Sequence, residues 1–230
     1  MNLNSPNGID VGFTFIPDWK IVRAAWVLPL FTVFTAMTIH AVSGNARAFP
    51  FFISESDYEG LERWIFTLGL ASSGVLLCIT AHRFNIRFHN QDMPKRQRWS
   101  YISGWITGCS MFVLSFMNMY DYLIPHTATS IFVFGGGLSW GISTHLLVGP
   151  SSTGLNIRKF GLVIAAVGMS VLNTSMGYYL LFSKKIDFDG SSIQSTLDAL
   201  QPAINFAAPG EYLLFIGLVV CMASFEREVV

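Results

Sequence analysis

Charged residues are scarce in this sequence, which indicates that lipid rather than water surrounds much of the protein. Of its 230 residues only 12% are charged and 52% are hydrophobic, and the mean hydropathy is positive. A soluble domain carries about twice this charged fraction. The formal net charge is zero and no basic tail is present, so binding to nucleic acid is not expected.

Cysteines and catalytic signatures are also few. The three cysteines, Cys78, Cys109 and Cys221, lie in apolar runs without a CxxC or Cys/His spacing. We interpret them as small buried hydrophobic residues rather than as disulfide or zinc ligands. The sequence has no HExxH motif, no GxSxG motif and no His/Asp pair at helical ligand spacing, so we expect no metal site and no cofactor. Residues 1–18 are polar and mixed, unlike a secretory signal.

Long apolar runs are what the sequence does have. Six of them cover roughly residues 21–42, 61–82, 100–120, 127–148, 157–182 and 203–225, and a helix needs about 20 apolar residues to cross the hydrocarbon core. Backbone groups in lipid must be bonded within their own segment, so each run is predicted to be a helix. The period-two pattern of a membrane barrel is absent. The predicted fold is all-α: a single polytopic domain over residues 1–230, built as a six-transmembrane-helix bundle.

Lysine and arginine in the short loops indicate the orientation of the bundle. Ten of the fourteen lie on the side of the termini: Lys20, Arg23, Arg83, Arg87, Lys95, Arg96, Arg98, Arg158, Lys159 and Arg227. The other side has Arg47, Arg63, Lys184 and Lys185. Both termini are therefore predicted to be cytosolic. Residues 40–66, the turn at 120–125 and the loop at 183–201 would then face the lumen or the cell exterior.

Pairs of small residues predict where helices approach closely. Gly104 and Gly108 lie one turn apart in the third run, and Gly137 and Gly141 repeat this spacing in the fourth. We interpret both pairs as helix-packing positions, with a hinge at the three consecutive glycines 135–137 as the alternative.

Ionisable residues near the predicted outer face are the candidate site residues, because charges at the edge of a span are costly. They are His40, Glu62, His126 and Glu211. If the sixth span begins near residue 203, Glu211 lies about 12 Å along the helix. If it begins at Pro209, Glu211 is an ordinary acid of the first turn.

Two interpretations of these four residues are open. They could form a metal site or a general acid–base pair, or they could bond to one another and to helix ends and thereby lock the loop. The absence of a catalytic signature favours the second. The basic segment 83–98 is explained by orientation alone, and docking on anionic head groups is a compatible but unspecific second role.

The loop itself carries a resemblance. His40, the segment Phe49-Pro50-Phe51-Phe52-Ile53-Ser54 and the segment Glu62-Arg63-Trp64-Ile65-Phe66 resemble the first luminal loop of the DRAM proteins (damage-regulated autophagy modulators), within the wider DRAM/Frag/Sfk group of six-span membrane proteins. Arg83-Phe84, His126 and Ala208-Pro209-Gly210-Glu211-Tyr212 also match the family pattern. The chain departs from it where Glu55-Ser56-Asp57 replaces Asp-Thr-Gly, Leu61 replaces proline and Tyr212 replaces tryptophan.

The resemblance implies a non-enzymatic membrane protein that modulates autophagy, lysosomal function or membrane-lipid organisation in an endolysosomal membrane. Membrane lipids, and as a further class other membrane proteins, would be its partners. Without a sorting signal in the predicted cytosolic parts, the plasma membrane and other endomembranes stay open. The alternatives are a lipid-modifying enzyme of the GPI-lipid-remodelling kind, using His126, Glu211, Glu62 and His40, and a lipid or solute conduit, for which the polar residues within the spans are few.

Overall fold

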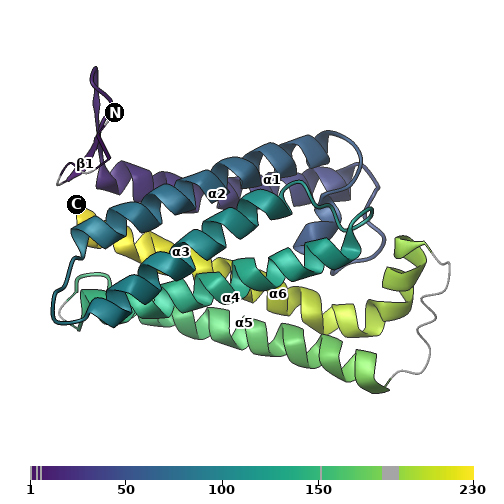
Figure 1. The fold of residues 1–230 in the computed structure, drawn as a ribbon. Helices are drawn as coiled ribbons and strands as arrows, with labels where there is room; N and C mark the ends of the chain where they lie inside the picture. The colour runs from purple at the N-terminus through teal and green to yellow at the C-terminus, as the bar shows by residue number, and fades with distance from the viewer. Residues whose placement is uncertain (1, 4, 6, 151, 183–191) are drawn as a thin grey trace.

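In the computed structural model, a short β-hairpin precedes six long α-helices (Figure 1). The structure describes residues 2, 3, 5, 7–150, 152–182 and 192–230. Strands β1 (Gly8–Asp10) and β2 (Phe15–Pro17) pair antiparallel. The helices are α1 (Asp18–Val42), α2 (Leu61–Arg87), α3 (Pro94–Leu114), α4 (Leu123–Val148), α5 (Leu155–Phe182) and α6 (Ile193–Val229), with a short 3-10 helix η1 (Ile53–Ser56) between α1 and α2. The predicted all-α fold is confirmed.

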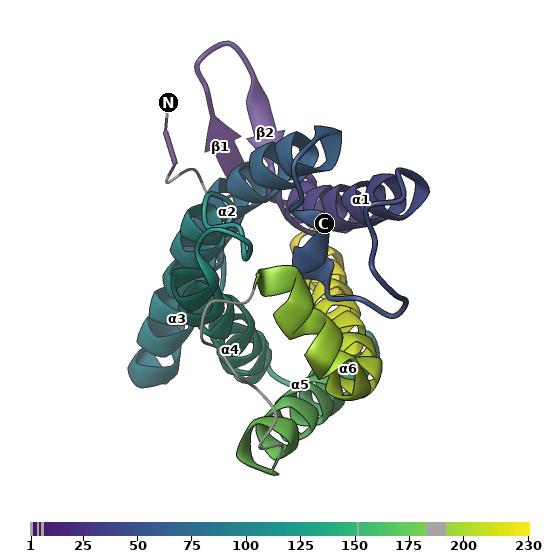
Figure 2. The same cartoon turned by 90° about the vertical axis from the view of Figure 1, so that its right-hand side faces the viewer.

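The helices run up and down along one axis, so that both chain termini lie at the same end (Figure 1). We call this the terminal end and the opposite one the cap end. Each helix packs against its neighbours in sequence, and α1 also contacts α6, which closes the bundle. Seen from the cap end, α5 lies at the periphery, packed mainly on α6 (Figure 2). The η1 segment and the first turns of α6 cover this end of the bundle.

Five of the helices, α1, α2, α4, α5 and α6, are long and apolar enough to cross a membrane. The chain is therefore an integral, multi-pass membrane protein by length and composition. The sequence predicted six spans, and α3 is the predicted span that is not among these five. The basic residues of its first turns, Lys95, Arg96 and Arg98, lower its hydropathy. Further along the helix, Ser100, Ser103 and Thr107 are buried inside the bundle, and the Ser100 and Thr144 hydroxyl oxygens are 2.7 Å apart.

Helix α6 begins earlier than the sequence suggests. Its N-cap is Ser192, whose side chain accepts a hydrogen bond from Ser195 N, so the expected start near residue 203 lies inside the helix. Of the predicted loop at 183–201, residues 183–191 lie outside the described residues, and residues 193–201 are helical. Pro202 and Pro209 are both accommodated within the helix. Glu211 is consequently an interior residue of α6, and the alternative that made it a first-turn acid is wrong.

Glycines bring α5 and α6 into backbone contact. They recur every seventh residue, at Gly161 and Gly168 of α5, with Gly154 in the turn just before it, and at Gly210 and Gly217 of α6. A Cβ at Gly168 would lie 2.3 Å from Leu214 N, and one at Gly217 would lie 2.4 Å from Ala165 N. Neither position has room for a side chain, so these glycines set the distance between the two helices.

The glycine pairs singled out in the sequence also lie at helix contacts. A Cβ at Gly104 would lie 2.5 Å from Ala81 Cβ, and one at Gly141 would lie 2.9 Å from Leu162 Cδ2. At Gly135, by contrast, a Cβ would meet nothing within 4 Å. Residues 135–137 are helical, in the middle of α4.

Replacement of Gly168 by alanine should therefore destabilise the bundle. Because the added methyl group would overlap the α6 backbone, we expect Gly168→Ala to lower the free energy of unfolding by about 1–3 kcal/mol. The control is Gly177→Ala on the same helix, where a Cβ would meet nothing within 4 Å and where alanine favours the helix. Thermal unfolding in detergent measures both variants. Equal midpoints for the two would contradict close α5–α6 packing.

Candidate functional site

The loop between α1 and α2, residues 43–60, folds back over the cap end; we call it the capping loop. Phe51 and Ile53 are buried within it, whereas Phe49 is exposed. The Phe51 ring lies edge-on to the His40 ring, with centroids 5.4 Å apart. Phe52 packs against the buried apolar cluster at the start of α6. The aromatic segment of the loop thus meets the helix ends through Phe51 and Phe52.

Helix α6 holds the capping loop through two consecutive residues. Glu211 Oε2 accepts a hydrogen bond of 2.7 Å from Ile53 N in the interior. The Tyr212 hydroxyl donates to Phe51 O. Glu211 is buried, so this carboxylate serves as a fixed acceptor for the backbone N–H that opens η1.

Glu55 is the centre of a second set of contacts. It is fully buried, and its carboxylate accepts 2.9 Å hydrogen bonds from Phe52 N and from Arg47 Nε. Arg47 also donates to Asp198 of α6 over 2.8 Å, and the Tyr120 hydroxyl donates to Glu55 O. Burial raises the pKa of Glu55, while the Phe52 N–H and the Arg47 guanidinium oppose that rise. These bonds join the capping loop to α6 and to the α3–α4 turn.

His40 and Glu62 meet at the base of the same loop. His40 Nδ1 lies 3.6 Å from Glu62 Oε1, and that oxygen accepts a 2.7 Å hydrogen bond from Asn45 Nδ2. Both side chains are buried. Gly60 has a φ of +139°, and a Cβ there would lie 2.8 Å from Glu62 Oε2. Glycine is therefore required immediately before α2.

His126 does not join this group. It is buried at the start of α4, and its Nδ1 bonds to Met117 O in the turn between α3 and α4. Of the four sequence candidates, the structure brings His40 and Glu62 together and places Glu211 against the capping loop. His126 instead fixes the neighbouring turn.

Asp57 is the residue that sequence reasoning missed. It is buried, and neither carboxylate oxygen has a hydrogen-bond partner among the described residues. The Arg63 guanidinium lies 3.9 Å away and is shared with Asp121. Burial raises the pKa of Asp57 to about 7, with Arg63 lowering it and Asp121 raising it further. Its only signal in the sequence is its place in Glu55-Ser56-Asp57, where the chain departs from the DRAM pattern.

The terminal end holds its own buried ion pairs. Arg83 Nε donates to Asp18 Oδ1 over 2.7 Å, and both side chains are buried. Arg158 pairs with Glu228 and lies over the Phe225 ring, 4.1 Å from its centroid. In the sequence, Arg83 belongs to the orientation signal and to the DRAM-like pattern, and Arg158 to the orientation signal. Their burial and pairing could not be predicted, because both depend on the tertiary fold.

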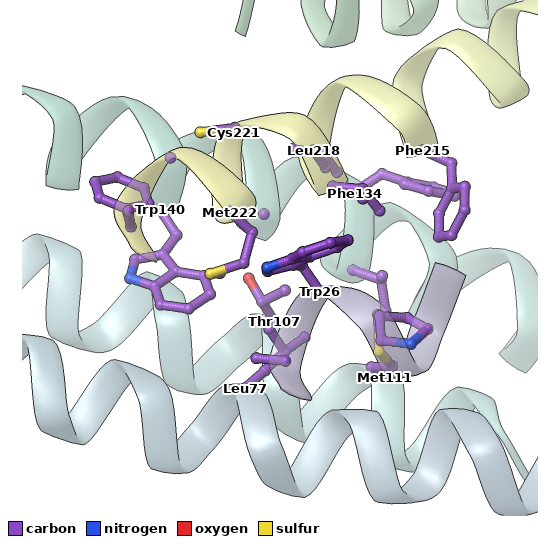
Figure 3. Close-up of a pocket in the computed structure, with 17 residues that line it drawn as sticks. Trp26, Leu77, Thr107, Met111, Phe134, Trp140, Phe215, Leu218, Cys221 and Met222 are labelled. Atoms are coloured by element: carbon purple, nitrogen blue, oxygen red, sulfur yellow. The ribbon is translucent and has the colours of Figure 1, made fainter. Parts of the chain in front are cut away.

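Between the two ends lies an apolar cavity of about 80 Å³ (Figure 3). Trp26, Met111, Trp140, Phe215 and Met222 are among the residues that line it, from α1, α3, α4 and α6. Its lining is mostly apolar, so it offers few groups that could bond an ordered water.

What the cap can do chemically follows from these contacts. In the part of the chain that the structure describes, no group of three or more His, Cys, Asp or Glu side chains is placed to hold a metal ion. Glu55 and Glu211 each accept a backbone N–H in the folded state. The arrangement is that of a lock between loop and helices.

The buried carboxyl of Asp57 predicts that the cap is more stable in acid. Its pKa of about 7 in the folded state exceeds its ordinary value of 3.8, so the folded form binds the proton more tightly. The resulting stability is complete below about pH 4 and is lost as the pH rises through about 7, on the order of 2–4 kcal/mol. We expect the thermal unfolding midpoint of the purified protein to decrease as the pH is raised from about 4 to above 7. The variant Asp57→Asn should lose most of this decrease.

The matched control is Glu59→Gln, an exposed acid of the same loop, which should leave the pH dependence unchanged. Glu55 contributes in the same direction because its pKa is also raised, so a smaller slope remains in Asp57→Asn. A full slope in that variant would exclude Asp57 as its source.

Comparison with known proteins gives no matching family model, no matching curated protein and no matching solved structure. Membership of the DRAM family therefore stays a prediction from the motifs of the capping loop and α6.

Proposed function

We propose that the chain is a DRAM-like, six-span membrane protein that acts without catalysis, through membrane lipids and partners in the bilayer. One observation carries this proposal: Glu55, Glu211 and His126 are each bonded to a backbone group or to a basic side chain, and Asp57, whose oxygens have no hydrogen-bond partner among the described residues, is buried. Glu211 accepts from Ile53 N, and Glu55 is bonded to Arg47. A hydrolytic or transferase site instead needs its acid and base free to meet a substrate.

The sixth span of this proposal is α3. At 21 residues it extends about 31 Å. The part from Trp99 to Leu114, beyond its basic first turns, extends about 24 Å, and the hydrocarbon core is about 30 Å thick. It packs between α2 and α4, both of which are apolar enough to span. Its serine and threonine hydroxyls donate to carbonyl groups of their own helix or bond to Thr144, which supports placing it in lipid.

The distribution of unpaired basic residues supports cytosolic termini. At the terminal end Lys95, Arg96 and Arg98 are exposed. At the cap end Arg47 and Arg63 are both paired with acids. Among the residues that the structure describes, the unpaired positive charge thus lies at the terminal end, the pattern expected of the cytosolic side.

This orientation is tested by labelling single introduced cysteines in sealed membranes. Gln91→Cys in the α2–α3 loop and Glu59→Cys in the capping loop are both exposed positions. We expect a membrane-impermeant maleimide added from the cytosolic side to label Gln91→Cys only. Labelling of Glu59→Cys from that side would reverse the orientation.

The biological setting comes from the resemblance alone. We propose an endolysosomal membrane and a role in autophagy or in membrane-lipid organisation. The acid stabilisation predicted from the buried Asp57 would suit a cap that faces an acidic lumen.

Two substitutions of Glu211 separate the non-enzymatic proposal from the lipid-modifying enzyme. Glu211→Gln keeps an oxygen that accepts from Ile53 N but removes the titrating group, whereas Glu211→Ala leaves that buried N–H unpaired. A structural role predicts near-normal stability for Glu211→Gln and a loss of about 1–3 kcal/mol for Glu211→Ala, measured by thermal unfolding.

Lipid profiles of cells producing these variants complete the test, with Glu59→Gln as the control. We expect Glu211→Gln to change cellular lipids in the same way as the unaltered protein. If a well-folded Glu211→Gln variant abolishes a lipid conversion that the unaltered protein performs, the chain is an enzyme and the non-enzymatic proposal fails.

A further inference from the structure

A groove on the outside of α3 and α4 is separate from the cap and lies toward the terminal end. It has a volume of about 550 Å³ and is lined mainly by α4, with Lys95, Arg96 and Trp99 contributed by the start of α3. Trp99 and Ile142, which line it, are exposed. The groove is therefore accessible from the side of the bundle.

The groove has a charged end and an apolar end. Ser100 of α3 lies beside Thr144 of α4, so Lys95 and Arg96 are level with the end of α4. From Leu146 near that end, the lining extends along α4 to Gly135, about 16 Å deeper at 1.5 Å per residue. The α4 residues between them include leucine and isoleucine side chains. The groove is therefore complementary to an amphiphile with a charged head and an extended apolar chain.

The positive charge at the mouth of the groove is not neutralised by the protein. Among the described residues, no acid forms an ion pair with Lys95 or Arg96. Asp92 is the one acid in the connection between α2 and α3, and it is exposed. Arg83 and Arg158, by contrast, are buried against Asp18 and Glu228.

We propose that this groove binds an anionic phospholipid, with its phosphate at Lys95 and Arg96 and an acyl chain along α4. The Trp99 indole, held by a 3.0 Å hydrogen bond from Nε1 to Ser139 Oγ, lies in the lining between head and chain, as tryptophans do at membrane interfaces. A soluble anion would leave the apolar lining uncovered, and a zwitterionic lipid would leave the two cations without a net counter-charge. The site requires that the chain spans a membrane, and it is independent of the cap.

The test uses the purified full-length chain in detergent, titrated with dioleoylphosphatidylglycerol or dioleoylphosphatidylcholine and followed by native mass spectrometry. We expect the anionic lipid to bind about tenfold or more tightly than the zwitterionic one, because each basic residue near a head group contributes on the order of 1 kcal/mol. The double variant Lys95→Gln/Arg96→Gln should lose this preference. Arg98→Gln, an exposed neighbour outside the groove, should retain it.

A second variant tests the apolar part without touching the charges. A Cβ at Gly135 meets nothing within 4 Å, so Gly135→Leu places a side chain in the groove without a clash in the bundle. We expect it to weaken binding of both lipids, while Gly177→Leu, also at an open position, leaves binding unchanged. Gel filtration and circular dichroism confirm that each variant is folded.

Three results would overturn the proposal. Arg98→Gln could weaken the preference as much as the double variant, which would indicate diffuse charge rather than a site. Gly135→Leu could bind like the unaltered protein, which would show that no chain occupies the groove. Glycerol 3-phosphate, which lacks acyl chains, could compete as well as the lipid, which would identify a simple anion site. None of these outcomes bears on the capping loop.

Discussion

The hydrogen bond from Ile53 N to Glu211 is the contact on which the cap depends. The two bonded residues are 158 positions apart in the chain, and each supplies the hydrogen-bond partner that the other lacks. A carboxylate inside a membrane helix is costly unless it is bonded, and the first N–H groups of a helix have no partner of their own. Their bond ties the α1–α2 connection to α6 and supports the contact between α1 and α6 that closes the bundle.

The terminal end follows the same rule with ion pairs. Asp18 with Arg83 joins the start of α1 to the end of α2, and Arg158 with Glu228 joins the start of α5 to the end of α6. Desolvation largely offsets the attraction within such buried pairs. The main effect of these two ion pairs is therefore on helix register. Each ion pair fixes the position of one helix along the axis of the helix that it contacts. Polar contacts at both ends leave the middle to apolar packing and to the glycines of α5 and α6.

The sequence predicted the helices because length and hydropathy are local properties. Helix α3 is the exception, because its first turns carry Lys95, Arg96 and Arg98, which lower its mean hydropathy below that of the other five helices. The start of α6 lies earlier than predicted because residues 193–201 are too polar to belong to an apolar run, although they are helical and the helix continues through Pro202. The unpaired state of Asp57 could not be predicted at all, because it depends on how residues 43–60 fold. The seven-residue spacing of Gly161 and Gly168 was readable from the sequence and was overlooked.

The two ends of the bundle differ in what they offer to a membrane. At the cap end, Arg47 and Arg63, the basic residues of that end which the structure describes, are engaged by acids. At the start of α3, Lys95 and Arg96 are exposed and have no acidic partner among the described residues. Orientation during insertion requires only that such residues lie on one side. A lipid site requires in addition an apolar surface beside them, and the groove along α4 supplies it. The same residues can therefore orient the chain first and hold a lipid afterwards.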